Sequence, residues 1–221
     1  MNDSTTNAED DVALMLHRSD DLHEALLRHV DDTPSDRSLR GEATFGMCAV
    51  SLQHAVSLRI LVTSGCHTSA IGLMRLQFES LTRALWLLYV ASDAAIAKLT
   101  APLTPGNEQA AKNLPSVSEM VEQIRKEVGT KVPPRAYQMI GRFKEVSWDS
   151  LNSFVHGGIH PLHRHAEGYP PQLILDVLRN SNGLSTMAGM TLAILTGNEN
   201  IARSMGRVQP AFEDCLPELQ A

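Results

Sequence analysis

The chain has 221 residues, of which 43% are hydrophobic and 20% charged, and its formal net charge is −6. This composition is typical of a globular domain with a substantial core, and the negative charge argues against a protein that coats nucleic acid non-specifically. The charge is uneven, because residues 1–40 hold ten acidic and four basic side chains whereas residues 125–165 hold three acidic and seven basic ones. A local basic face is therefore compatible with the sequence.

The hydrophobic pattern predicts helices along most of the chain and no strands, because apolar residues recur at helical rather than alternating spacing. We expect residues 1–8 to be disordered and residues 9–216 to form a single domain, an all-α antiparallel helical bundle. The first helix is predicted at about 8–30 and ends at the breaker DDTPSD.

The centre of the bundle is predicted to be a helical hairpin. A second helix runs from about residue 37 to 63, and a third, the clearest element in the chain, from about 68 to 98. The turn SGCHTS between them is short, so the two helices must lie side by side and antiparallel.

A connector at 99–115, rich in Pro, Gly and Asn, follows the hairpin. Ser116 and Glu119 after it have the spacing of a capping box, which predicts the start of a short helix. The rest of the bundle is predicted as three further helices, at about 134–156, 171–196 and 198–214. A His-rich loop at 157–170 joins the first two of them.

Three charged residues interrupt the otherwise apolar third helix: Arg75, Glu79 and Arg83. Their i, i+4, i+8 spacing places them on one narrow strip with apolar residues on both sides. Glu79 can pair with both arginines, and the guanidinium donors left over require another partner, which can be another helix, another subunit or a phosphate. The strip is compatible with a structural ion ladder and with part of a functional site.

The stretch LNSFVHGGIHPLHRH contains four histidines, and Gly157-Gly158 divides it. Asn152 and His156 share one helix face before the glycines. The remaining three are predicted to lie in the exit loop: His160, His163 and His165. A histidine at a helix C-terminus has an ordinary structural explanation, since the helix dipole favours positive charge there. The functional alternative is a polar pocket in which Asn152 and His156 meet Arg75 and Glu79, extended by Arg83 and His160.

Several kinds of site are disfavoured by the absence of their motifs. The histidines have no HExxH core and no nearby cysteine, so we expect no metal site. No G-x-S-x-G nucleophile elbow, P-loop or GxGxxG sequence occurs, and we expect no cofactor. Acid–base chemistry on a phosphodiester, or binding of one, is the chemistry that an imidazole beside an arginine and an amide would suit.

The segment LMRLQFESLTRALWLLY (73–89), followed about seventy residues later by LNSFVHGG (151–158), resembles a HEPN-like group of bacterial proteins. The likeness is carried by an R-x3-E helix paired with a helix that ends in a polar residue, three others and His-Gly. It spans roughly residues 40–195.

The resemblance implies an α-helical bundle, commonly a homodimer, in a superfamily that includes metal-independent RNases of defence and toxin–antitoxin systems as well as non-catalytic members. His156 then matches the catalytic histidine, and Asn152 lies near the family's polar position. The family's arginine should fall at Asp149, Ser150 or Leu151, where this chain has none, so another arginine would have to replace it in space.

The preferred hypothesis is a divergent or non-catalytic HEPN-like module that binds RNA, a nucleotide or an antitoxin-like partner protein in a defence or toxin–antitoxin setting. The alternative is a metal-independent endoribonuclease in which His156 is the general acid and base and an arginine, with Arg75 as the candidate, stabilises the transition state. A structural helical partner protein is the third reading. An arginine close to an accessible His156 is what the nuclease hypothesis requires.

The expected location is the cytoplasm, without a membrane partner. Cys48, Cys66 and Cys215 are odd in number and widely spaced, which is typical of a reducing compartment. The first residues are acidic and polar, unlike a signal peptide, and the most apolar run, ALWLLYVA, is too short to cross a bilayer.

Overall fold

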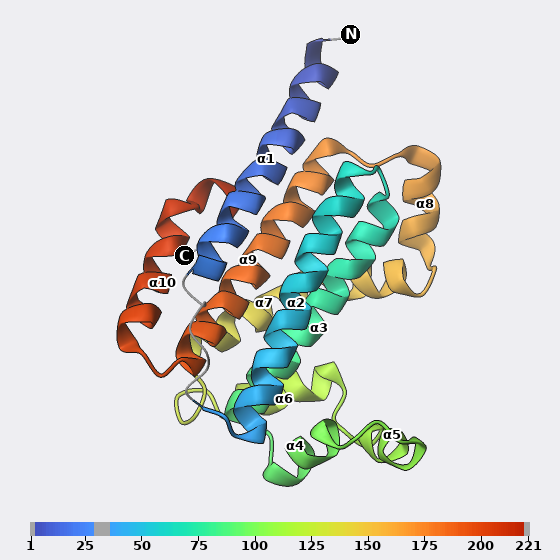
Figure 1. Ribbon diagram of the computed structural model, residues 1–221. Coiled ribbons are helices and arrows are strands. Elements are labelled where there is room, and N and C mark those ends of the chain that lie inside the picture. The colour runs from blue at the N-terminus through green and yellow to red at the C-terminus, as the bar shows by residue number, and fades with distance from the viewer. Residues whose placement is uncertain (1–2, 29–35, 219–221) are drawn as a thin grey trace.

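Three long helices form the centre of the molecule (Figure 1). α2 (Leu39–Thr63) and α3 (His67–Tyr89) make an antiparallel hairpin, and α9 (Pro171–Leu195) packs against both. The computed structural model describes residues 3–28 and 36–218, with side chains from residue 8 onward. Gly65 closes the hairpin turn at φ +71°, a left-handed conformation that favours glycine. The hairpin predicted from the sequence is confirmed.

The other helices surround this centre. α1 (Asp3–Arg28) and α10 (Glu199–Ala211) pack against α9, whereas α6 (Val117–Lys126) and α7 (Pro134–Val155) pack against α3. In Figure 1, α7 crosses behind the central helices. The arrangement confirms the predicted all-α antiparallel bundle, and the described residues contain no strand beyond one isolated bridge.

The remaining elements lie at the two ends of the hairpin. Beside the α2–α3 turn stands α8 (Ile159–Glu167), as Figure 1 shows, and Tyr169 just after it hydrogen-bonds Thr68. The opposite end carries the short helices α4 (Asp93–Thr100) and α5 (Pro105–Ala111). A 3₁₀ turn, Glu213–Cys215, precedes the last described residues.

A buried amide ties the three central helices together. Gln77 of α3 has no exposed surface, and its Nε2 donates to the carbonyl oxygen of Ser181 at 2.9 Å and to Ser185 Oγ at 3.2 Å, both on α9. Ser181 Oγ returns a hydrogen bond to Gln77 Oε1 at 2.7 Å. On the α2 side, Ser51 Oγ donates to the backbone carbonyl of Gln77 at 3.0 Å. Because a buried polar group without partners is costly, this network fixes the rotation of α3 against α2 and α9.

One helix, α2, is long and apolar enough to cross a membrane by length and composition alone. The apolar-run criterion applied to the sequence did not pick it out, because its apolar residues are interspersed with polar ones. Within the fold, α2 packs against α3 and α9, and its buried Arg59 donates to Asp20 of α1 at 2.7 Å. Core helices of soluble proteins meet the same criterion, so the finding is weak evidence of a membrane span.

The predicted helix 68–98 is two helices, which corrects the sequence analysis. The chain leaves α3 after Tyr89, and Ser92 caps α4 by accepting a hydrogen bond from the backbone of Ala95 at 3.3 Å. The apolar run continues through the break, so hydrophobic periodicity alone did not reveal it, while the Ser-Asp pair that caps α4 did carry the signal.

The His-rich segment 157–170 is mostly a helix rather than the predicted loop. Gly157 (φ +64°) ends α7, and α8 begins two residues later. Pro161 falls in the first turn of α8, where proline is tolerated because the first N–H groups have no helical partner. Ser153 Oγ accepts a hydrogen bond from the backbone N–H of His160 at 3.1 Å and so satisfies one of them.

Two other boundaries differ from the prediction. α1 begins at Asp3, inside the segment 1–8 that was predicted to be disordered. Residues 1 and 2 lie outside the described part of the chain. The connector 99–115 includes α5, which Thr104 caps and in which Pro105 occupies the first turn. The capping box of Ser116 and Glu119 forms as predicted.

The Gln77 network predicts a specific stability effect. Replacing Gln77 with Met, an apolar side chain of similar size, leaves Ser181 Oγ buried without its acceptor, and we expect the free energy of unfolding to fall by about 1–3 kcal/mol. Urea unfolding followed by circular dichroism measures it. Gln172→Met, at an exposed position of α9, should change stability by less than about 0.5 kcal/mol. A loss equal in the two variants would contradict the assigned role of Gln77.

The α7–α8 turn generates a second prediction. A Cβ on Gly158 would lie 2.5 Å from Ser153 Oγ, so Gly158→Ala must displace the hydroxyl that caps α8, at a cost of about 1 kcal/mol. Thermal unfolding should show a lower midpoint. The matched control is Gly206→Ala in α10, where a Cβ meets nothing within 4 Å and alanine is the better helix former. An unchanged midpoint for Gly158→Ala would show that this cap is dispensable.

Candidate functional site

An arginine and a histidine from distant parts of the chain meet where α3 faces the end of α7. Arg75 Nη1 lies 3.3 Å from His156 Nε2, and Arg75 Nη2 forms an ion pair with Glu79 Oε1 at 2.8 Å. The Arg75 side chain is 14% exposed and that of Glu79 26%, whereas His156 is an exposed residue. We call these three residues the Arg75 cluster. Of the four residues expected to converge, Arg75 contacts both Glu79 and His156.

The ring of Trp148 on α7 packs against the guanidinium group of the cluster. Arg75 Cζ lies 4.8 Å from the centroid of the Trp148 ring, which is within cation–π range. Arg75 Nε is buried and has no hydrogen-bond partner among the described residues. The ring therefore offsets part of the cost of burying this donor and helps to hold the guanidinium in its position over the ring.

The fold positions the cluster through α3. Gln77 fixes the rotation of α3, and Phe78, fully buried next to it, stacks on Phe143 of α7 with ring centroids 4.7 Å apart. Arg75 lies one turn before Phe78, and both residues contact Trp148 of α7. His156 caps the C-terminus of α7, with its backbone N–H bonded to the Asn152 carbonyl at 3.0 Å, so its ring stands at the open end of the helix.

The Arg75–His156 contact determines the state of the imidazole. Arginine has only donors, so Nη1 must donate and His156 Nε2 must accept. The contact therefore requires the neutral ring with its proton on Nδ1, and an imidazolium cannot form it. An anion placed between the two side chains could instead accept hydrogen bonds from both, with the ring protonated.

The other predicted site residues take different positions. Asn152 is half-buried on α7, and Arg83 is half-buried on α3; neither side chain makes a hydrogen bond or ion pair within the described residues. Glu79 pairs with Arg75 but not with Arg83, so the predicted ladder has one rung. His160 lies on α8, where its ring packs 6.1 Å from that of Phe154. Among the described residues, the side chains of Asn152, Arg83 and His160 make no hydrogen bond or ion pair with the Arg75 cluster, although the Asn152 carbonyl accepts the backbone N–H of His156.

The residues that support the Arg75 cluster were not predicted from the sequence. Trp148 shows no local signal, because its ring matters only through its contact with a residue 73 positions away. Ser153 and Gly158, which form the turn into α8, were hidden by the expectation that the segment is a loop. The i, i+4 spacing of Arg75 and Glu79 was the part of the cluster that local pattern could reveal.

Metal coordination is not indicated in the described part of the chain, where no three His, Cys, Asp or Glu side chains come together in a suitable group. His163 instead pairs with Glu167 at 3.3 Å on the exposed surface of α8, and Arg164 pairs with the same carboxylate. Both contacts lie on the exposed surface of α8, where pairs of this kind contribute little to stability.

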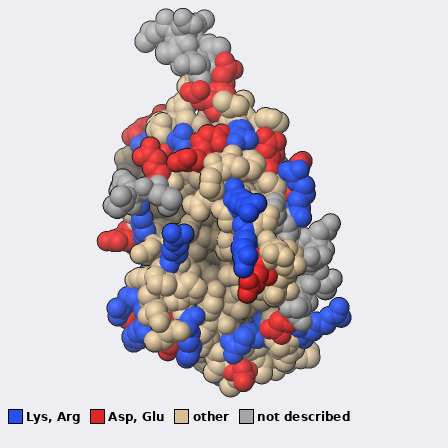
Figure 2. All heavy atoms as spheres, turned by 90° about the vertical axis from the view of Figure 1, so that its left-hand side faces the viewer, with Lys and Arg blue, Asp and Glu red and all other residues tan. Residues whose placement is uncertain are grey.

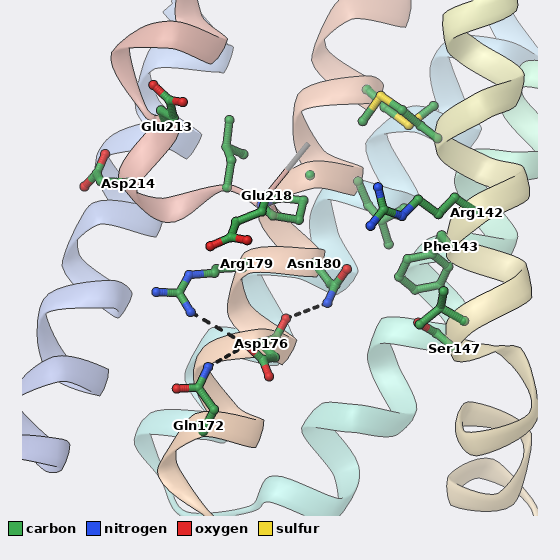
Figure 3. A pocket seen from close by; sticks show the side chains of 17 residues that line it. Arg142, Phe143, Ser147, Gln172, Asp176, Arg179, Asn180, Glu213, Asp214 and Glu218 are labelled. Atoms are coloured by element: carbon green, nitrogen blue, oxygen red, sulfur yellow. Dashed lines mark hydrogen bonds and ion pairs between the residues drawn. The ribbon is translucent and has the colours of Figure 1, made fainter. Parts of the chain in front are cut away.

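A separate groove of about 870 Å³ lies between α7 and α9 and is bordered by the segment 213–218. Figure 3 shows Arg142 reaching toward it from α7, and Arg179 and Glu218 from the other sides. None of the predicted site residues lines it. Arg142 thus belongs to this groove, and Arg75 is the arginine that reaches the histidine.

Charge alone does not select a ligand for the groove, because its lining includes both arginines and the acidic residues Asp176, Glu213 and Glu218. The molecular surface has the same mixed character: on the face that Figure 2 shows, basic side chains flank a central hollow while acidic ones gather toward the α1 end. A broad basic surface is not present on this face.

A family model described as a family of unknown function (DUF6988) matches residues 48–218. No curated protein and no solved structure gives a significant match. The matched segment includes every residue of the Arg75 cluster, together with Trp148 and the groove. Because it covers more than half of the chain, the chain belongs to the DUF6988 family.

Proposed function

We propose that this protein is a HEPN-like module that binds RNA or a nucleotide through a phosphate held between Arg75 and His156. The observation that carries the proposal is the contact of Arg75 Nη1 with His156 Nε2 at 3.3 Å, made by an exposed histidine. A cytoplasmic role in defence or a toxin–antitoxin system accompanies the proposal through the family resemblance.

Phosphate suits this pair on chemical grounds. An arginine fork and an imidazolium are both donors, and hydrogen bonds between charged groups and phosphate oxygens are about twice as strong as neutral ones. The Glu79 ion pair and the Trp148 ring hold the guanidinium in place before any ligand arrives, which reduces the entropy lost on binding. Binding exchanges the Arg75–His156 hydrogen bond for hydrogen bonds from the two side chains to the anion.

The surroundings of His156 favour a partner that covers an apolar rim. Val155, Ile159 and Leu162 are 39%, 63% and 70% exposed on α7 and α8. Exposed apolar side chains gathered beside a polar site are typical of interaction surfaces. In addition to RNA, this rim supports contact with a protein, either a second copy of the chain in a homodimer or an antitoxin-like partner.

Metal-independent RNase activity is the second candidate, and the same contact favours it. An arginine now stands next to the histidine even though the sequence lacks one at the family position. His156 would act as general acid and base, and Arg75 would stabilise charge developing on the phosphorus. The ion pair with Glu79 already uses part of the guanidinium, which is why binding without cleavage is preferred.

The binding proposal predicts a loss of affinity on removing either member of the pair. A fluorescein-labelled single-stranded RNA of about eight nucleotides, a length within the usual range of single-strand sites, serves as the probe. His156→Ala and Arg75→Gln should each weaken binding by roughly tenfold or more, since a hydrogen bond to a charged group contributes about 1.5–3 kcal/mol. Fluorescence anisotropy measures the dissociation constants.

Arg207→Ala is the matched control, because it removes one exposed arginine from α10, a helix that packs on α9 rather than on α3. It should change affinity by less than about threefold, as expected for a distant surface charge screened by salt. RNA binding that survives both cluster variants, or that Arg207→Ala weakens equally, would contradict the assignment of the site.

The nuclease candidate makes its own prediction. Wild-type protein incubated with total RNA should cleave it equally well with and without EDTA, and His156→Ala should lower the rate by at least about 100-fold, the usual contribution of a general acid or base. Denaturing gel electrophoresis measures the products. If the wild type binds RNA but produces no fragments, the nuclease candidate is rejected and the binding proposal stands.

A further inference from the structure

Arg83 is a cation of α3 that the fold does not use. Its side chain is half-buried and has no hydrogen bond or ion pair among the described residues, in contrast to Arg75 two turns earlier. Buried or half-buried arginines are normally paired, because removing a guanidinium from water is costly. A ligand that brings negative charge to Arg83 would repay this cost.

The spacing along α3 separates Arg83 from the phosphate position at the Arg75 cluster. Eight residues of helix correspond to about 12 Å along the axis. Glu79 lies between the two arginines, and its carboxylate is held by Arg75 at 2.8 Å. An anion midway between the arginines would meet that carboxylate, so one phosphate cannot serve both.

We propose that Arg83 binds a second phosphate, and that the ligand of this site is therefore a single-stranded oligoribonucleotide whose backbone follows α3. The inference rests on the proposed function and specifies its ligand. Arg75 and His156 hold one phosphate, Arg83 holds another further along the strand, and the intervening backbone passes outside Glu79.

The outer surface of α3 is open to such a strand. Gly72 has no side chain, and a Cβ built there would have Val155 Cγ2, at 4.0 Å, as its one neighbour within reach. Leu76, between the two phosphate positions, is 37% exposed and offers an apolar contact for a base. Ser80, also between the arginines, is half-buried, and α3 itself has no basic residue between Arg75 and Arg83.

A single strand fits better than a duplex or a mononucleotide. The Arg75 side chain is recessed, with 14% of its surface exposed, and a flexible backbone can turn one phosphate inward to reach it. Double-stranded RNA is bound through many contacts spread over a long surface, which the net charge of −6 does not favour. A mononucleotide occupies the Arg75 position but leaves Arg83 unpaired.

The test combines salt dependence with ligand length. Dissociation constants for the labelled single strand of about eight nucleotides are measured by anisotropy over a range of salt concentrations, and uridine monophosphate is measured by competition. For single strands, each phosphate contact contributes about 0.7 to the slope of log K against log salt. Arg83→Ala should lower that slope by about 0.7. It should also weaken binding of the oligonucleotide several-fold and leave the affinity for the mononucleotide unchanged.

Two variants control the measurement. Arg83→Lys keeps the positive charge and should retain the wild-type slope, and Arg207→Ala removes an equal charge from α10 and should also leave the slope unchanged. Circular dichroism melting confirms that each variant is folded. An RNA hairpin of equal nucleotide number should bind more weakly than the single strand.

The outcomes separate this inference from the proposed function. If His156→Ala weakens the oligonucleotide while Arg83→Ala behaves like Arg207→Ala, the second phosphate position is rejected and the proposed function stands. An equal loss for mononucleotide and oligonucleotide in Arg83→Ala, or tighter binding of the hairpin, also overturns the inference. If wild-type protein binds neither RNA nor mononucleotide, both proposals fail.

Discussion

The buried amide of Gln77 is the constraint on which the arrangement of this bundle depends. It has no exposed surface, and its hydrogen bonds to Ser181 and Ser185 must form because water cannot replace them. Rotating α3 by a single residue would swing this side chain through about 100° into an apolar neighbour. The network therefore selects one rotation of α3, and apolar packing alone would tolerate others.

That rotation places the polar residues of α3. With Gln77 directed at α9, Phe78 meets Phe143 and Arg75 comes to lie over Trp148 of α7. The Arg75 cluster is thus held by core contacts on one side and open on the other, where His156 is exposed. Core contacts and the Trp148 ring position such a site before binding, and the His156 ring is the part of it that faces solvent. Recognition of an anion requires this arrangement, whereas catalysis requires in addition that Arg75 release part of its hold on Glu79.

Local pattern in the sequence was sufficient for most of the fold. The periodicity of apolar residues predicts the α2–α3 hairpin, α7 and α9, and the capping box predicts the start of α6. Prediction from local pattern failed where two signals conflict. The apolar run from α3 continues into α4 past the Ser92 cap. Pro161, which is disfavoured inside a helix, is accommodated in the first turn of α8, within the segment that was predicted to be a loop.

The site was predictable only in part for a different reason. Arg75 and Glu79 are neighbours on one helix, so their pairing follows from spacing, but the Arg75–His156 contact joins residues 81 positions apart. Predicting it requires the packing of α3 on α7, which depends on Gln77, Phe78 and Phe143 rather than on the polar residues themselves. The unpaired state of Arg83 is also a tertiary property, since its spacing from Glu79 is as favourable as that of Arg75.

Side-chain NMR during titration with a short single-stranded RNA observes the two groups that are proposed to hold the phosphate. We expect the Arg75 Nε and His156 ring resonances to shift together and saturate with the RNA, while those of Arg207 stay in place. RNA binding that leaves the Arg75 and His156 resonances unchanged would contradict this expectation.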